Sequence, residues 1–383
     1  MVETLTNNRP IHVPKRGLRV DPDEGASIMM DPLKRSRIVS FLEQEVHNQH
    51  IPGAVLYVSH QGQPLLKEAV GYRAVHPAAL PMQVDTVFDL ASLTKVIATL
   101  PAVLKLLEQG KLSLSDPIDA FLPDFTQQQG ETVRILHLLT HTSGLAADLP
   151  MAVTLKSSRE ELLQRITQAS PRHQPGTKVV YSDLGLIMLY QIIEHITGEP
   201  FEAFLQREFF DPMEMRDTSF LPKYERARFA ATEFSSEHND YKCGIVHDEK
   251  AERLGGISGH AGLFSTVDDL ARFATMMEQG GAFKGQRLLS EAAIKLSRNN
   301  FTPYDTEFRG LGWLLKNQLS YSSCGDFMSL SSYGHTGFTG TSLWFDPEIQ
   351  LHVILLTNRV HFGRKDHILR LRPRLHNLIY HSL

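Results

Sequence analysis

The order in which strand and helix patterns follow one another is the feature that most restricts how this chain can fold. A β-prone hairpin pattern stands at 53–72, helical periodicity dominates the middle of the chain, and strand-like segments return in its last third. Because like elements come in runs, the pattern predicts an α+β fold rather than an alternating α/β fold. We expect the early and late strands to form one antiparallel β-sheet flanked by helices, with an all-helical subdomain inserted between them.

Local patterns set the expected boundaries of these elements. The first helix should begin at Asp31-Pro32, because Asp is a good N-cap and Pro suits the first helical position. Pro101 should kink a helix that spans 93–109. Other helices are expected at 134–140, 159–168, 184–197, 267–278 and 366–381, and strands at 53–60, 64–72, 308–315, 328–335, 341–346 and 350–357.

The same pattern divides the chain into three parts. Residues 1–30 mix proline, asparagine, glycine and charge without periodicity, and are expected to form an N-terminal arm. Residues 31–98 and 285–383 together should form a sheet domain, and residues 99–284 a mostly helical subdomain.

Composition narrows the classes of function. Lys and Arg number 39 against 43 Asp and Glu, a formal net charge of −4, which does not favour general binding to nucleic acid or anionic membranes. No apolar run approaches the ~18–20 residues that span a bilayer. The N-terminus lacks the ~7–15-residue apolar stretch of a secretory signal, so we expect a soluble, cytoplasmic protein. Cys243 and Cys324 are expected to be free thiols. Nothing in the sequence predicts a cofactor, a metal or an oligomeric state.

The sharpest chemical motif is Ser92-Leu-Thr-Lys95, at the junction of an extended segment and a helix. A serine hydroxyl is a weak nucleophile at neutral pH and needs a base close by. A lysine three residues along a helix lies one turn away on the same face, and the helix N-terminus favours negative charge on the oxygen. This spacing is a signature of penicillin-recognising serine enzymes. Alone it is weak, because serine is also a common N-cap.

A second cluster, Tyr181-Ser-Asp183, lies at a loop-to-helix junction, where a tyrosine can face a cleft. A neighbouring cation such as Lys95 would favour the phenolate form of this tyrosine, which can act as a base. An ordinary half-buried tyrosine is the alternative interpretation.

A third cluster, Gly334-His-Thr-Gly-Phe-Thr-Gly340, lies where strands resume near the C-terminus. Glycines in a strand mark the close approach of a ligand or of another backbone. One N–H group of this cluster could pair with the N–H of Ser92 as an oxyanion hole. His335 could present a donor or a switchable charge to a substrate carboxylate or leaving group. A glycine-rich hairpin turn with a surface histidine is the alternative.

Taken in order, Ser92-x-x-Lys95, Tyr181-x-Asp183 and the His335 motif resemble the motifs of the serine β-lactamase-like superfamily. The resemblance is to the branch that holds class C β-lactamases, D-alanyl-D-alanine carboxypeptidases, D-aminopeptidases and family VIII esterases. It covers roughly residues 35–382. It implies an antiparallel sheet flanked by helices and an all-helical subdomain, with the site in the cleft between them.

The resemblance also implies a role for each matched residue. Ser92 would be the acylated nucleophile, and Lys95 would hold it and help to deprotonate it. Tyr181 would act as general base in acylation and as proton donor to the leaving group. His335 stands where many relatives carry lysine. The backbone N–H groups of Ser92 and Phe338 would stabilise the oxyanion, and the substrate side of the site would comprise Asp183, Thr336, Gly337 and Phe338.

One departure from the family pattern bears on the expected activity. Asp183 replaces the usual Asn, and a carboxylate there could pair with Lys95 but cannot donate to a substrate carbonyl when ionised. We therefore expect a serine hydrolase that acts through an acyl-enzyme on a small-molecule ester, amide or peptide. Esterase or D-amino-acid peptidase-like activity is favoured over β-lactamase activity. The missing secretory signal disfavours an extracellular carboxypeptidase.

Other interpretations stay open. A member of the same fold could bind a peptidoglycan-like or peptide ligand without turnover, or serve only as a structural or assembly protein. His137 and His141 have possible zinc spacing but no third ligand, so helix-end packing is favoured. The polar segment 241–249 is expected to be a loop at the rim of the cleft. The basic residues near the C-terminus are expected on a solvated helix face: Arg364, Lys365, Arg370, Arg372 and Arg374.

Overall fold

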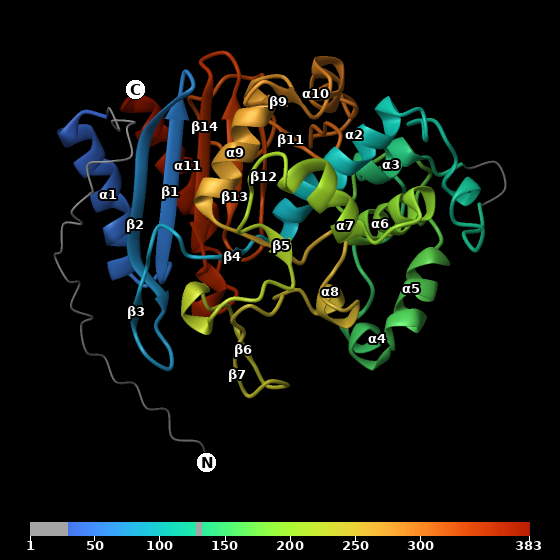
Figure 1. Cartoon of the computed structure of the whole chain (residues 1–383), viewed down its shortest axis with the longest axis horizontal. Helices are drawn as coiled ribbons and strands as arrows, with labels where there is room; N and C mark the ends of the chain where they lie inside the picture. The colour runs from blue at the N-terminus through green and yellow to red at the C-terminus, as the bar shows by residue number, and fades with distance from the viewer. Residues whose placement is uncertain (1–29, 128–131) are drawn as a thin grey trace.

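The computed structural model describes residues 30–127 and 132–383 (Figure 1). Its central feature is a seven-stranded sheet in the order β11-β12-β13-β14-β1-β2-β3, in which every neighbouring pair is antiparallel. The predicted union of early and late strands in one antiparallel sheet is therefore confirmed. The strands are β1 (Gly53–His60), β2 (Gln63–Ala74), β3 (Leu80–Pro81), β11 (Leu314–Leu315), β12 (Tyr333–Thr336), β13 (Ser342–Asp346) and β14 (Leu351–Thr357).

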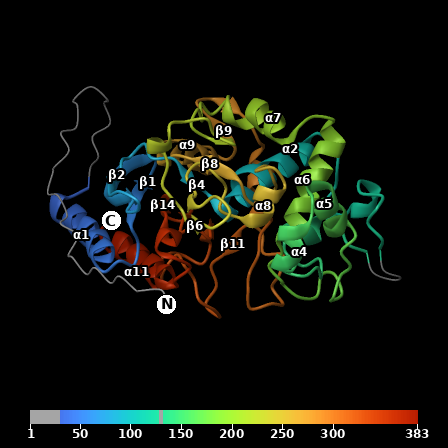
Figure 2. The same ribbon diagram turned by 90° about the horizontal axis from the view of Figure 1, so that it is seen from below.

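Helices cover both faces of this sheet, which explains why β14 is buried along its whole length. On one face α1 (Pro32–His47) and α11 (His367–His381) lie side by side, as Figure 2 shows. On the other face α9 (Val267–Glu278) packs against β1 and β14. Successive side chains of a strand point to opposite faces, so Leu56 joins the core under α1 and α11, and Val55 joins the main core.

The region between the two groups of strands is dominated by helices. The most apolar of them, α6 (Asp183–Thr197), is largely buried and ends at Gly198, whose φ of 69° is the left-handed conformation that favours glycine. Around it lie α2 (Leu100–Glu108), α3 (Ile135–Leu139), α4 (Met151–Lys156), α5 (Arg159–Thr167), α7 (Phe201–Leu205) and α8 (Glu249–Arg253); α10 (Glu291–Ser297) follows later.

The same region also holds short strands, and of these the sequence predicted only β4, which lies in the short extended segment expected at 87–91. They form a three-stranded sheet, β4-β8-β5, and two separate pairs, β6-β7 and β9-β10. Two-residue pairings leave no alternating pattern long enough to recognise. The bounds are β4 (Phe88–Asp89), β5 (Ser219–Phe220), β6 (Phe234–Ser235), β7 (Asp240–Tyr241), β8 (Leu263–Ser265), β9 (Ala282–Phe283) and β10 (Gln286–Arg287).

Three boundary predictions differ from the structure, and the first is the strand expected over 328–335, which begins only at Tyr333. The helix expected over 93–109 is present as a continuous helical run over 91–108, but this run passes through a 3₁₀ turn (Ala91–Leu93) and a π-helical turn (Lys95–Thr99) before α2. Pro101 lies in the first turn of α2, directly after the π-helical turn, where its missing N–H needs no partner. The strand expected over 308–315 is reduced to Leu314–Leu315.

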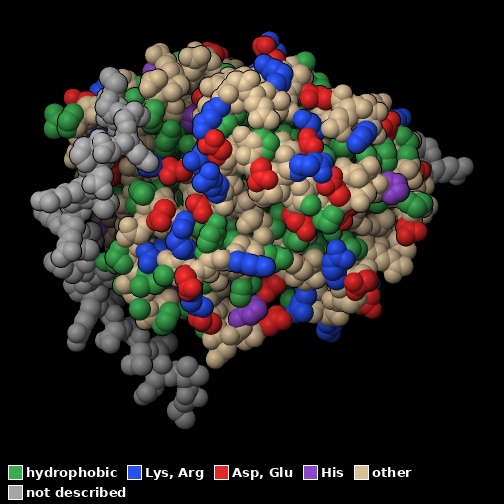
Figure 3. All heavy atoms as spheres, viewed as in Figure 1, with side chains coloured by type: hydrophobic (Ala, Val, Ile, Leu, Met, Phe, Trp, Pro, Cys, Tyr) green, Lys and Arg blue, Asp and Glu red, His purple; other side chains and the backbone are tan. Residues whose placement is uncertain are grey.

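The arm predicted for residues 1–30 lies outside the described residues except for its last position, and the division into domains stays a prediction. Cys243 and Cys324 are free thiols, as predicted. Charges of both signs are interspersed over the face shown in Figure 3. Across residues 30–127 and 132–383, no helix combines the length and apolarity needed to cross a membrane.

Candidate active site

Ser92 lies in a tight turn whose backbone is held by its neighbours. Ala91 has a φ of 47°, a left-handed conformation that costs a non-glycine residue about 1–3 kcal/mol. Asp89 Oδ1 accepts a hydrogen bond from Ala91 N at 2.8 Å, and Thr94 Oγ1 donates to the Ala91 carbonyl oxygen at 2.7 Å. Lys95 lies one turn further along the same helical run, which brings its side chain beneath Ser92.

Lys95 is fully buried and holds the serine hydroxyl. Its Nζ donates to Ser92 Oγ at 2.9 Å and to the carbonyl oxygen of His260 at 3.0 Å, and forms an ion pair with Asp183 Oδ1 at 2.8 Å. Burial opposes the charge of this ammonium, but the Asp183 carboxylate and Tyr181 outweigh burial and raise the pKa of Lys95. The pairing of Lys95 with Asp183 expected from the sequence is present.

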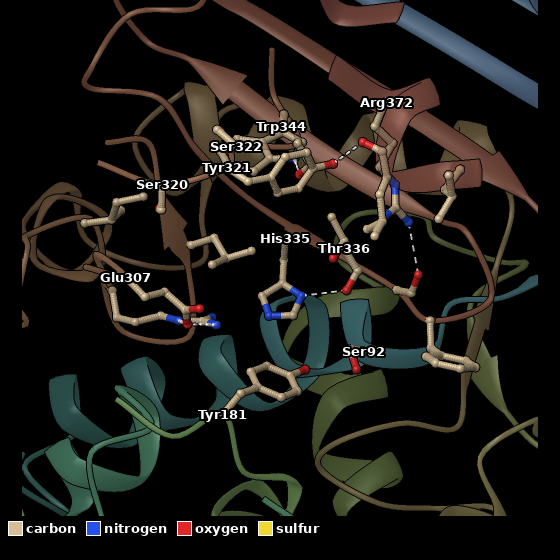
Figure 4. Close-up of a pocket in the computed structure, with 18 of the residues that line it drawn as sticks. Ser92, Tyr181, Glu307, Ser320, Tyr321, Ser322, His335, Thr336, Trp344 and Arg372 are labelled. Atoms are coloured by element: carbon tan, nitrogen blue, oxygen red, sulfur yellow. Dashed lines mark hydrogen bonds and ion pairs between the residues drawn. The ribbon is translucent and has the colours of Figure 1, made fainter. Parts of the chain in front are cut away.

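Tyr181 lies among aromatic rings and cations at the entrance to this cluster. Its ring centroid is 4.5 Å from that of His141 and 6.0 Å from that of His335. Lys95 Nζ lies 4.9 Å from the ring centroid, and Arg309 Cζ lies 5.3 Å from it. Figure 4 shows the hydroxyl groups of Tyr181 and Ser92 pointing toward one another.

His141 supports this arrangement and does not share a helix with His137. The helix α3 ends at Leu139, and His141 lies beyond it with a φ of 57°. Its Nδ1 accepts a hydrogen bond from Ser182 N at 3.1 Å, which orders the chain next to Tyr181. Burial, helped by nearby cations, lowers the pKa of His141 well below its usual range.

His335, on β12, is buried and neutral. Its Nδ1 lies 2.9 Å from the Thr336 carbonyl oxygen, which only accepts, so Nδ1 carries the proton. Burial, with Arg309 and Lys95 adding to it, lowers the pKa of His335 well below its usual range. Its Nε2 is therefore an acceptor, and it has no hydrogen-bond partner among the described residues. The structure thus disfavours the switchable positive charge that we expected at this position.

The turn after β12 is bonded directly to the segment that precedes Ser92. Thr341 Oγ1 donates to the Leu90 carbonyl oxygen at 3.0 Å. A Cβ on Gly337 would lie 2.5 Å from that same carbonyl oxygen, so only glycine fits there. The turn that carries the Phe338 N–H is thereby tied to the chain that carries the Ser92 N–H.

Arg372 corrects the prediction of a wholly solvated basic helix face. Its side chain is buried, and its Nη2 donates to the carbonyl oxygens of Gly337 at 3.1 Å and Thr341 at 2.7 Å. Burial lowers the pKa of Arg372 to about 9. The other members of the predicted cluster are exposed: Arg364, Lys365, Arg370 and Arg374.

Behind Lys95, charged side chains continue away from the cavity. The second oxygen of Asp183, Oδ2, lies 3.5 Å from the Nζ of buried Lys250. Lys250 Nζ also lies 2.7 Å from Asp148 Oδ2 and 3.7 Å from Asp248 Oδ2. Asp248 Oδ1 lies 2.8 Å from His260 Nε2. Segment 241–249, expected at the rim, therefore contributes Asp248 to the interior of the site.

Asp183, Asp248 and His260 place potential ligand atoms within 4.8 Å of one another, a spacing that a metal ion could use. Both carboxylates, however, already face ammonium groups, Lys95 and Lys250. Two buried positive charges would repel a cation at this point. We assign the trio to the ion-pair network.

A cavity of about 480 Å³ opens in front of Ser92 and is large enough for a small molecule. Ser92, Tyr181 and His335 line its floor, and Figure 4 shows all three facing into it. Its other walls combine apolar side chains with arginines: Leu314, Trp344, Leu369, Arg309, Arg359 and Arg372.

The structure brings together the residues that the sequence singled out. Ser92, Tyr181, His335, Thr336, Gly337 and Phe338 line the cavity, and Lys95 and Asp183 lie beneath Ser92. Sequence reasoning missed Asp89, Arg309, Lys250 and His260 as parts of the site. The charged run His-Asp-Glu-Lys at 247–250 was the available indication of Asp248 and Lys250.

Comparison with known proteins gives matches over most of the chain. The family model described as Beta-lactamase matches residues 38–377. A Bacillus subtilis (strain 168) protein named N-acetylmuramyl-L-alanine amidase is 34% identical over 347 residues, which cover 81% of this chain and 78% of that protein. A Salmonella agona (strain SL483) protein named "Putative D-alanyl-D-alanine carboxypeptidase" is 30% identical over 375 residues, covering 89% and 85% respectively.

A solved structure with the same fold is EstCE1, a hydrolase with promiscuous acyltransferase activity. It superposes with a TM-score of 0.71 at 22% identity, covering 90% of this chain and 99% of EstCE1. At this identity the match establishes the fold alone.

Proposed function

The chain belongs to the β-lactamase family of serine hydrolases, and from this premise we propose that it cleaves an ester or amide bond through an acyl-enzyme on Ser92. The observation that carries the proposal is the 2.9 Å hydrogen bond from Lys95 Nζ to Ser92 Oγ. A serine needs an adjacent activating group to be nucleophilic. A fully buried lysine beside it, with Tyr181 facing the same hydroxyl, supplies one.

In the proposed reaction Ser92 Oγ attacks the substrate carbonyl carbon while its proton passes to the phenolate oxygen of Tyr181, which the adjacent Lys95 ammonium stabilises. The carbonyl oxygen becomes an oxyanion and accepts hydrogen bonds from the N–H groups of Ser92 and Phe338. Tyr181 then returns the proton to the leaving alcohol or amine as the C–O or C–N bond breaks. A water molecule hydrolyses the acyl–Ser92 ester and restores the free hydroxyl.

We favour an esterase or D-amino-acid peptidase-like activity over β-lactam hydrolysis. The names of the amidase and carboxypeptidase relatives support an amide substrate. Burial opposes the charge of Asp183, but Lys95, His260 and Lys250 outweigh burial and lower its pKa, which keeps the carboxylate ionised. An ionised carboxylate cannot donate to a substrate amide carbonyl.

Intact mass spectrometry tests the proposal. Wild-type protein incubated with a fluorophosphonate should gain one adduct mass at Ser92, whereas Ser92→Ala should gain none. Wild type should also hydrolyse p-nitrophenyl esters of short acids. Absence of an adduct from both a fluorophosphonate and a penicillin would contradict an acyl-enzyme. Ligand binding that is unchanged in Ser92→Ala, with no turnover, would instead support the non-catalytic alternative.

Asp183→Asn should raise nitrocefin hydrolysis by roughly tenfold, because the amide can donate one hydrogen bond to the substrate, worth ~1–1.5 kcal/mol. Initial rates at saturating nitrocefin check this. A matched control is Asp119→Asn, which removes a carboxylate that hydrogen-bonds to Gln127 instead. No change in Asp183→Asn, or a fall, would show that the carboxylate is not what limits β-lactam turnover.

A further inference from the structure

We propose that Lys250 is a positioning residue that sets the charge balance at Ser92 by sharing the Asp183 carboxylate with Lys95. This inference rests on the function proposed above. Lys95 Nζ lies 2.8 Å from Asp183 Oδ1, and Lys250 Nζ lies 3.5 Å from Asp183 Oδ2. Lys250 is absent from the residues that line the cavity, and its side chain is 5% exposed, so it acts through Asp183 rather than on substrate.

The contacts form a closed ring. From Lys95 it runs to Asp183, then to Lys250, then to Asp248, then to His260, whose carbonyl oxygen accepts a hydrogen bond from Lys95 Nζ at 3.0 Å. The members come from separate parts of the fold, including the π-helical turn, α6 and α8. Because each member depends on the next, removing one leaves a buried neighbour short of a partner.

The physical need for Lys250 follows from the carboxylate at position 183. A buried carboxylate paired with one lysine would hold that lysine firmly as an ammonium. A second cation beside the other carboxylate oxygen repels the proton on Lys95 and offsets part of the stabilisation that Asp183 gives to the Lys95 ammonium. Removing Lys250 should therefore increase the affinity of the group formed by Lys95 and Tyr181 for protons.

Several other charged groups face these residues and are left unchanged by the variants used below. Asp148, which is 43% exposed, and Asp248 face Lys250 directly. On the cavity side, Arg309 lies beside Tyr181, with neutral His335 and His141 next to the same ring.

The first experiment measures the acylation rate of Ser92 by a p-nitrophenyl ester as a function of pH. Loss of the positive charge in Lys250→Met should move the acid limb of the pH–rate profile to higher pH by about one unit. Lys250→Arg, which keeps the charge, should restore most of the wild-type profile. Lys284→Met removes a lysine whose side chain is 63% exposed, and its limb should coincide with that of wild type. An unmoved limb in Lys250→Met would overturn the proposal.

A double-mutant cycle with Asp183→Asn separates this role from a merely structural one. Asp183→Asn alone should move the acid limb to lower pH. Adding Lys250→Met to Asp183→Asn should then shift the limb by less than about half of the shift that Lys250→Met causes in wild type. Equal shifts in both backgrounds would show that Lys250 does not act through Asp183.

Thermal unfolding provides a readout that does not depend on activity. Lys250→Met should lower the melting temperature less in the Asp183→Asn background than in wild type, because Lys250 is then one of two buried cations that have lost the same carboxylate. If Lys250→Met fails to fold, Lys250→Gln takes its place in both measurements, and an unmoved acid limb in that variant contradicts the proposal. If wild type is never acylated, the proposed function fails, and this cycle alone decides whether Lys250 and Asp183 are coupled.

Discussion

Lys95→Met is expected to slow the acylation of Ser92 by at least about 10³-fold, the scale of a lost general acid–base system. Methionine has a similar length but no charge and no N–H group. Ser92 Oγ would lose its 2.9 Å hydrogen bond, and Asp183 Oδ1 its 2.8 Å ion pair. Single-turnover labelling by a fluorophosphonate, followed by intact mass, measures the rate.

The same variant should also lose stability, because it leaves a buried carboxylate short of a partner, at a cost of about 3–5 kcal/mol if nothing compensates. Lys250 offsets part of this loss. The double variant Lys95→Met/Asp183→Asn separates the two effects, since it should regain the melting temperature without regaining acylation. A Lys95→Met protein that is acylated within tenfold of the wild-type rate would exclude Lys95 from the chemistry.

Gly337→Ala is the second variant with a large expected effect, a loss of about 10²–10³ in kcat for ester hydrolysis, the scale of one lost oxyanion donor. The new Cβ would lie 2.1 Å from Thr341 Oγ1 and 2.5 Å from the Leu90 carbonyl oxygen. The backbone at Gly337 or at Leu90 must therefore move. Either movement shifts the Phe338 N–H relative to Ser92. Steady-state kinetics with a p-nitrophenyl ester check the loss.

Gly185→Ala is the matched control for a buried glycine. Its Cβ would meet Leu138 at 3.4 Å, an ordinary van der Waals distance, and the residue lies inside helix α6. Its kcat should stay within about threefold of wild type, because no cavity-lining backbone has to move. If Gly337→Ala behaved like Gly185→Ala, the close contact with Leu90 would not be what positions the Phe338 N–H.

Much of this protein could be predicted because its patterns are local. Asp31 and Pro32 predicted the start of α1, and α1 begins at Pro32 with Asp31 as its N-cap. Ser92 and Lys95 are three residues apart, so the geometry of one turn nearly settles their contact. Prediction failed where no local pattern exists, as in most of the two-residue strands, and it did not separate the 3₁₀ and π-helical turns from the regular helix that follows them.

By itself, the sequence predicts contacts between residues that are close along the chain, and it gives the order of the three motifs. It established the α+β fold, the family resemblance and the residues brought together around Ser92. Only the tertiary structure decided that Lys250 shares Asp183 with Lys95, that Arg372 is buried against Gly337, and that His335 is neutral. The physical reason is that charge state and ion pairing depend on burial and on partners from other elements. Separation along the chain carries no information about which of those partners will meet.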